Sequence, residues 1–158
     1  METFVINQHA IQTSLTTLRE KIGELITFFS QDLDFDQMVY PHWSAKDTLG
    51  HLTFWHESFA RNLFALAHGE KPRLLKGSLK EINQLSVAST ALDPIEALLN
   101  RMELAQHTIE HYILHQGISQ IPYRKNSRDY SAKEHLDIVA AHIARHLKEI
   151  RRFYQTHA

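Results

Sequence analysis

The sequence of 158 residues contains no cysteine. This absence excludes disulfide bonds, thiolate metal ligands and a cysteine nucleophile, so imidazole and carboxylate groups remain as metal donors. The lack of disulfides suits a cytoplasmic protein. Glycine and proline are also scarce, with 5 and 4 residues respectively. Because both residues interrupt helices, their scarcity predicts long helices.

The sequence also lacks an excess of charge of either sign. It has 17 basic and 18 acidic side chains and a formal net charge of −1. We therefore expect neither a nucleic acid nor a membrane surface as a partner. The first residues have neither the basic nor the apolar region of a signal peptide, and no apolar run approaches the roughly 18 residues that span a bilayer. We expect a soluble protein.

Apolar residues at alternating spacings of three and four predict four long helices. The first covers about residues 7–30. Ser44 with Asp47, and Ser131 with Glu134, form the capping-box pattern that begins the second and fourth helices. Asp93 followed by Pro94 is typical of a capping residue and a first helical position, and begins the third helix. The helices are expected to end near Gly69 (second) and Gly117 (third), with the fourth extending at least to Phe153.

Four amphipathic helices without strand-like alternation predict an all-α four-helix bundle, and 1–158 is expected to be a single domain. Residues 70–92, between the second and third helices, form a long crossover with a short helical piece at about 81–88. Residues 118–130 form another connection before the fourth helix. The order of the helices around the bundle stays open at this point.

Histidine is abundant, with 12 residues. His142 and His146 lie four residues apart beside the apolar face of the fourth helix, so their imidazoles can share one metal ion. A solvated pair would show the same spacing. His107, His111 and His115 on the third helix are a competing set, which we interpret as solvated. His135 is either a group behind the ligands or a surface residue. The candidate metal pair is therefore His142 and His146, and the other histidines considered are His107, His111, His115 and His135.

The segment before and within the second helix resembles a known family. Trp43-Ser44, Lys46-Asp47, Leu49 and His51-Leu52 are similar to the start of the second helix in the DinB-like (YfiT-like) superfamily. In that family this histidine is a metal ligand, and two further ligands lie on the last helix with three residues between them. The resemblance therefore implies a metal site of His51, His142 and His146, and it implies a homodimer.

Three neutral nitrogen ligands with an open position are typical of a catalytic metal site, and imidazole suits zinc or nickel. The expected cofactor is therefore a divalent transition metal, and the expected partner is a small-molecule substrate. The resemblance implies a metal-dependent hydrolase or a transferase that uses a low-molecular-weight thiol, and whether the chain is an enzyme stays open. The pocket candidates are Trp55, His56, Tyr112 and Tyr130, with His56 expected at the rim.

A finer resemblance supports an alternative. Residues 51–56 and 81–84 are similar to the DfsB/ClbS branch of the same superfamily, whose ClbS-type members protect the cell from a genotoxic metabolite. Some members of that branch lack the histidines of the last helix, whereas this chain has both. The alternative is therefore a non-catalytic small-molecule-binding or self-resistance bundle without metal.

Overall fold

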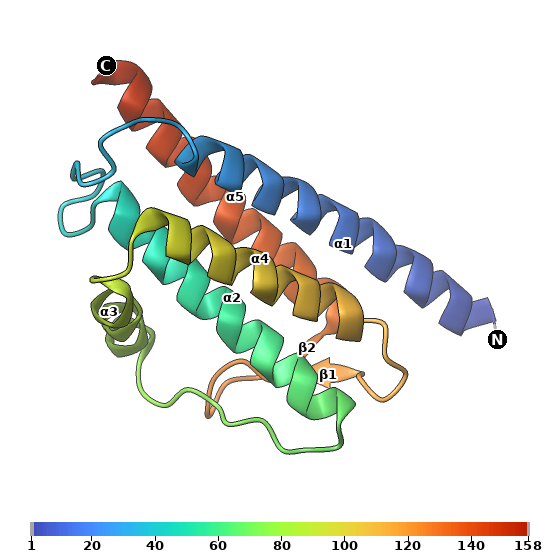
Figure 1. Cartoon of the computed structure of the whole chain (residues 1–158). Helices are drawn as coiled ribbons and strands as arrows, with labels where there is room; N and C mark the ends of the chain where they lie inside the picture. The colour runs from blue at the N-terminus through green and yellow to red at the C-terminus, as the bar shows by residue number, and fades with distance from the viewer. Residues whose placement is uncertain (1, 158) are drawn as a thin grey trace.

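The computed structural model describes residues 2–157, with side chains from residue 7 onward. Four long helices pack side by side as a bundle (Figure 1). This arrangement confirms the predicted all-α four-helix bundle. Residues 1 and 158 of the predicted domain lie outside the described residues. The bundle helices are α1 (Glu2–Phe29), α2 (Ala45–Ala67), α4 (Ile95–Tyr112) and α5 (Ala132–Thr156).

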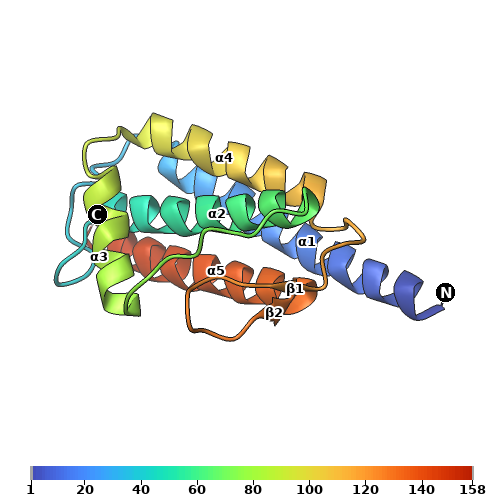
Figure 2. The same cartoon turned by 90° about the horizontal axis from the view of Figure 1, so that it is seen from below.

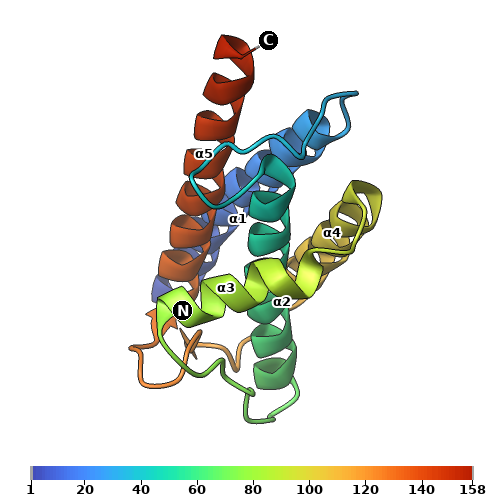
Figure 3. The ribbon, with the colours of Figure 1, turned by 90° about the vertical axis from the view of Figure 1, so that its left-hand side faces the viewer.

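The order of the helices, which the sequence left open, explains the long crossover. Each bundle helix packs against two others, in the cyclic order α1, α4, α2, α5. Helices α2 and α4 are parallel neighbours and begin at the end of the bundle where α1 and α5 finish (Figure 1). The chain must therefore return along the bundle between α2 and α4 (Figure 2). The helical piece in this crossover, α3 (Leu79–Thr90), lies across α2 (Figure 3) and extends two residues beyond the prediction at each end.

Both predicted capping boxes are present. The Ser44 hydroxyl accepts from the Asp47 backbone N–H while the Asp47 carboxylate accepts from the Ser44 N–H, and Ser131 and Glu134 do the same for α5. Gly69 follows α2 with a φ of +69°, a conformation that glycine adopts without a steric penalty. Local sequence was sufficient here because each cap needs only neighbouring residues.

The predicted cap of α4 is wrong. Pro94 occupies the N-cap position and no side chain caps the helix. The Asp93 carboxylate instead accepts a hydrogen bond from Arg101 Nη1 at 2.7 Å, and the same guanidinium donates to Glu57 at 2.6 Å. The Asp93 carboxylate therefore pairs with a guanidinium that carries a full positive charge, rather than with the backbone N–H groups of the first turn of α4.

The connection between α4 and α5 also differs from the prediction. Helix α4 ends at Tyr112 rather than near Gly117, and two short strands that the sequence did not indicate follow it. β1 (Gln120–Ile121) and β2 (Tyr130–Ser131) pair antiparallel, and the Ile121 side chain is completely buried. A two-residue ladder is too short to show alternation of apolar and polar residues, so no sequence pattern predicted it.

Aromatic side chains close the end of the bundle where α1 and α5 finish. Phe28, Phe29 and Phe35 are buried and pack on one another and, through Phe28 and Phe35, on Tyr154. The three phenylalanines therefore belong to the core of the chain and do not form a surface for a second copy of the chain. Among residues 2–157, no helix is both long and apolar enough to cross a membrane.

Candidate metal centre

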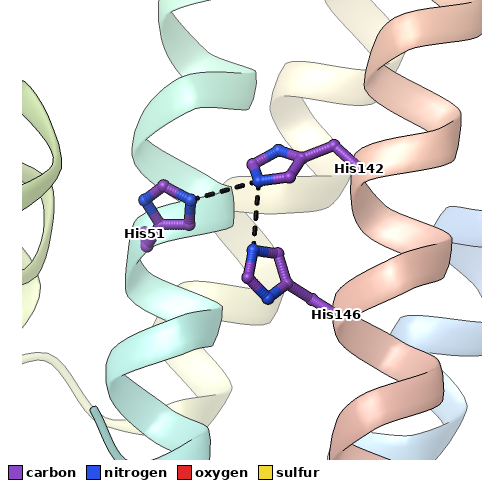
Figure 4. A group of neighbouring side chains, drawn as sticks. All are labelled: His51, His142 and His146. Carbon is purple, nitrogen blue, oxygen red and sulfur yellow. Dashed lines mark hydrogen bonds between the residues drawn. The ribbon is translucent and has the colours of Figure 1, made fainter. Parts of the chain in front are cut away.

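The structure brings together the three histidines predicted as metal ligands. His51 projects from α2, and His142 and His146 project toward it from α5 (Figure 4). His142 Nε2 lies 3.4 Å from His51 Nε2 and 3.0 Å from His146 Nε2. One nitrogen from each of the three rings lies within 4.8 Å of the others. Three nitrogens at this separation could hold one metal ion.

The tautomer of His51 follows from its hydrogen bonds. The Ser86 hydroxyl on α3 donates to the Asn83 carbonyl at 2.6 Å, so its oxygen accepts from His51 Nδ1–H at 3.2 Å. With the ring hydrogen on Nδ1, the lone pair of a neutral imidazole is on Nε2. The nitrogen that faces the other histidines is therefore a metal donor.

His146 is held in the same way by a different segment. The Tyr40 hydroxyl donates to Glu149 Oε1 at 2.9 Å and accepts from His146 Nδ1–H at 2.8 Å. Burial, followed by the Glu149 carboxylate, raises the pKa of Tyr40 well above its usual value, so its hydroxyl stays protonated. The lone pair of His146 is then on Nε2. A hydrogen-bond acceptor behind each ring is the usual support of a metal-binding histidine.

All three imidazoles are neutral at neutral pH. Burial first, and then the neighbouring histidines and Arg145, lower the pKa of His51 to about 3. Burial and Arg145 lower the pKa of His142 to about 4, and burial, His142 and Arg145 lower that of His146 to about 4. Neutral imidazole is the form that binds metals. Uncharged Nε2 atoms that converge on one point fit a divalent transition metal.

A cavity of about 310 Å³ lies beside the triad between α2 and α5. Helix α3 and the segment 118–130 cover it, and its volume is at the low end for small-molecule pockets, roughly 300–1,000 Å³. Three of the four pocket candidates line it. The lining residues are His51, Leu52, Trp55, His56, Leu79, Asn83, Tyr123, Tyr130, His135, Ile138, Val139, His142 and Ile143.

The fourth candidate, Tyr112, lies elsewhere. Its ring packs against Phe64 and His68, with centroids 5.5 and 5.6 Å away. Helix α4 contacts α1 and α2 and ends at Tyr112, far along α2 from His51. The sequence could not show this because it did not settle which helices are neighbours.

Two other histidines differ from expectation. His56 is only 2% exposed rather than at the rim, and its Nε2–H donates to Gln106 Oε1 at 2.8 Å. His135 is buried and stacks on Phe59 with ring centroids 4.0 Å apart. His107, His111 and His115 are exposed, as we interpreted them.

Sequence reasoning missed the residues that support the triad. Glu149 could have been found, because it lies three residues after His146 on the same helix. Tyr40 and Ser86 could not, because a polar loop and the short helix α3 reach the site only through the tertiary fold. Trp43 also contacts the site, with its ring centroid 4.7 Å from that of His51.

The helical-bundle fold of this chain is shared with solved structures. No protein-family model and no curated protein matches the sequence. Two solved structures do match: the crystal structure of the mycothiol-dependent maleylpyruvate isomerase, and that of a variant of the same enzyme with one histidine replaced by alanine. Their TM-scores are 0.71 and 0.70, with 16% and 14% identity over 89% of this chain. The chain spans 60% of the length of either structure. At this identity the match shows the fold.

Proposed function

We propose that this chain is a metal-dependent enzyme in which His51, His142 and His146 bind one divalent ion, zinc or nickel, and in which a low-molecular-weight thiol reacts with a small-molecule substrate. The observation that carries the proposal is the convergence of three Nε2 atoms beside a cavity, with two of the tautomers fixed from behind.

The matched structures favour a thiol over hydrolysis. Both carry the name of a mycothiol-dependent isomerase, and that dependence is a property of the isomerase. Since the chain shares 89% of its own length with that fold, we propose a thiol-dependent reaction here as well. Hydrolysis by a water molecule at the same site is the competing reaction.

The chain's own residues would orient the ligands and exclude solvent. A divalent ion supplies a Lewis acid, which lowers the pKa of a thiol or water molecule that reaches it. Ser86 and Tyr40 hold the His51 and His146 rings with Nε2 directed inward. Trp55, whose indole N–H donates to Asn83 Oδ1 at 2.9 Å, and Tyr130 line the cavity in which a substrate would be enclosed.

The test is to load the protein, purified without a histidine tag, with Co²⁺ and add thiols such as cysteine and glutathione. A thiolate-to-cobalt charge-transfer band and thiol transfer that stops with chelator are expected. Chelator-sensitive ester hydrolysis without such a band would indicate the hydrolase instead. Binding of small molecules with no metal requirement would favour the non-catalytic, self-resistance alternative. His107→Ala, at an exposed position on α4, is the control.

We also propose a cytoplasmic homodimer. The exposed Phe64 on α2 and Leu104 on α4, 44% and 67% accessible, offer an apolar surface for a second copy. Light scattering should give twice the chain mass of 18.4 kDa, and a monomer at micromolar concentration would contradict the dimer.

A further inference from the structure

Asn83 on α3 carries a hydrogen-bond donor of fixed orientation in the lining of the cavity beside the triad. Its Oδ1 accepts from the indole Nε1–H of Trp55 at 2.9 Å. An indole nitrogen can only donate, so the amide oxygen must face Trp55 and Nδ2 must point away from it. Nδ2 forms no hydrogen bond with any described residue and is accessible to solvent. Because Asn83 lines the cavity, a ligand there can reach this donor.

The backbone of Asn83 is tied to the triad. Its carbonyl accepts from the Ser86 hydroxyl at 2.6 Å, and the Ser86 oxygen accepts from His51 Nδ1–H at 3.2 Å. Residues three apart on a helix share one face, so the free amide lies on the same side of α3 as the hydroxyl that orients His51. The donor is therefore close to the proposed metal site.

Four aromatic rings in the cavity lining form a continuous aromatic wall. The ring centroids of Trp55 and Tyr123 are 6.1 Å apart, those of Tyr123 and Tyr130 are 5.5 Å apart, and those of Tyr130 and His135 are 6.0 Å apart. Aromatic rings bury large apolar areas and pack on other rings in offset or edge-on arrangements. The aromatic wall therefore favours a ligand with an aromatic or other planar group.

The cavity offers no charged side chain to a ligand. None of its lining residues, all in the described part of the chain, is Lys, Arg, Asp or Glu. A carboxylate or ammonium group that entered the cavity away from the metal would lose its hydration without gaining a counter-charge. A carbonyl oxygen needs only a hydrogen-bond donor, and Asn83 Nδ2 is one. The ligand that fits is uncharged and planar and has a carbonyl oxygen.

We propose that the cavity binds a neutral aromatic or conjugated carbonyl compound, whose oxygen accepts a hydrogen bond from Asn83 Nδ2 while its planar part packs on the aromatic wall. Asn83 then determines the specificity for a carbonyl group, and Trp55 positions its amide. That the bound compound is the substrate rests on the proposed function, because the metal ion and the thiol would have to act on it. The binding itself needs no metal ion.

Three small probes test the class of ligand. Acetophenone has a carbonyl group on a phenyl ring, ethylbenzene has a methylene group in its place, and benzoate has a charged carboxylate. They are added to the full chain with ¹⁵N-labelled asparagine, after a chelator has removed any ion to which benzoate could bind. Acetophenone should shift the side-chain amide signal of Asn83 more than ethylbenzene does, and benzoate should bind more weakly than acetophenone. Equal shifts with the two neutral probes, no Asn83 shift with acetophenone, or tighter binding of benzoate would overturn the proposal.

Variants measure the hydrogen bond through the ratio of the acetophenone and ethylbenzene affinities, in zinc-loaded and in metal-free protein. Asn83→Asp keeps an oxygen for the Trp55 N–H but replaces the donor with a carboxylate, which is ionised at about pH 8. The preference for acetophenone should fall roughly 5- to 10-fold, the effect of one hydrogen bond.

Gln84→Glu is the matched control for Asn83→Asp. It makes the same change of amide to carboxylate at the next residue of α3, which is exposed and lies outside the cavity lining. The control should leave the affinity ratio unchanged. An unchanged ratio in Asn83→Asp, or an equal fall in both variants, would show that Asn83 does not bind the carbonyl group.

Zinc affinity separates this proposal from the proposed function. The backbone carbonyl of Asn83 remains in Asn83→Asp, so Ser86 and His51 should keep their hydrogen bonds and zinc affinity should not fall. If the wild-type chain binds no metal but the probes give the expected results, the carbonyl site stands and the metal-dependent function fails. If metal and thiol bind but Asn83→Asp leaves the ratio unchanged, the function stands and the carbonyl site fails.

Discussion

Two hydroxyl groups determine which nitrogen of His51 and of His146 faces the centre. The Tyr40 and Ser86 oxygens each accept from an Nδ1–H, and each donates its own hydrogen elsewhere. A phenylalanine at position 40 would remove the acceptor and leave His146 free to change tautomer. We expect Tyr40→Phe and Ser86→Ala each to weaken zinc binding about 10-fold, the lower limit for such supporting residues.

Competition with a chromophoric chelator measures this loss. Ser89→Ala is the matched control for Ser86→Ala, because Ser89 lies on the same helix and its hydroxyl donates only to the Ser86 carbonyl at 3.2 Å. Equal affinities for all four proteins would show that the two hydroxyls do not orient the ligands.

Buried neutral histidines should make the protein sensitive to acid. The pKa of His56 and of His135 falls from 6.5 to about 4 in the folded chain, so the unfolded chain binds more protons between these values. The contribution of these two histidines to the free energy of unfolding is therefore fully present above pH 6.5 and is lost as the pH falls toward about 4. Each shift corresponds to roughly 3 kcal/mol. Urea unfolding of metal-free His56→Gln should show a weaker loss across this window than wild type, whereas exposed His107→Gln should match wild type.

The site residues differ in how far the sequence could reveal them. His142 and His146 share one helix face, which four-residue spacing is enough to show. His51 needed the motif from Trp43 to Leu52, because nothing in its local pattern indicates which helix it will meet. Tyr40 and Ser86 have no local signal at all, since their roles arise from contacts between segments 106 and 35 residues apart.

At the scale of the element, α3 is the part of the fold that ties the crossover to the site. Gly50 on α2 allows α3 to approach, because a Cβ there would lie 2.1 Å from Thr90 Oγ1 and 2.9 Å from Thr90 Cβ. Thr90 is buried and donates to the Ser86 carbonyl, so moving it would move the residue behind His51. The close approach therefore connects helix packing with ligand orientation.

Gly50→Ala should consequently destabilise the protein by about 1–3 kcal/mol and also weaken zinc binding. Chemical unfolding and chelator competition measure the two effects. Gly23→Ala is the control, because no atom lies within 4 Å of a Cβ at this exposed position of α1, and it should stabilise the protein by about 0.5–1 kcal/mol. Equal stability of the two variants would contradict the packing role of Gly50.

Elements were predictable where their signals are local. The capping boxes of α2 and α5 and the stop at Gly69 involve residues within one turn, and the structure has them. The predicted cap of α4 was wrong because Asp93 pairs with Arg101, which is eight residues away and also binds Glu57 on α2. The small β-ladder was not predicted because two residues carry no periodicity.

At the scale of the whole molecule, the helix order places the site. Helix α1 is not adjacent to α2, and α4 is not adjacent to α5, although each pair is consecutive in the bundle sequence. This order makes α2 and α5 neighbours. His51 thus faces the two histidines of the last helix, 91 and 95 residues further along the chain. That residues 1–158 form one domain stays a prediction.

The metal content of the purified chain tests the central claim most directly. Protein prepared without a histidine tag, reconstituted with Zn²⁺ or Ni²⁺ and desalted, should hold one ion per chain by mass spectrometry. His142→Ala should hold less than a tenth of that while keeping its helical circular dichroism. Wild-type protein that retains no ion after reconstitution, or His142→Ala that retains as much as wild type, would contradict the account.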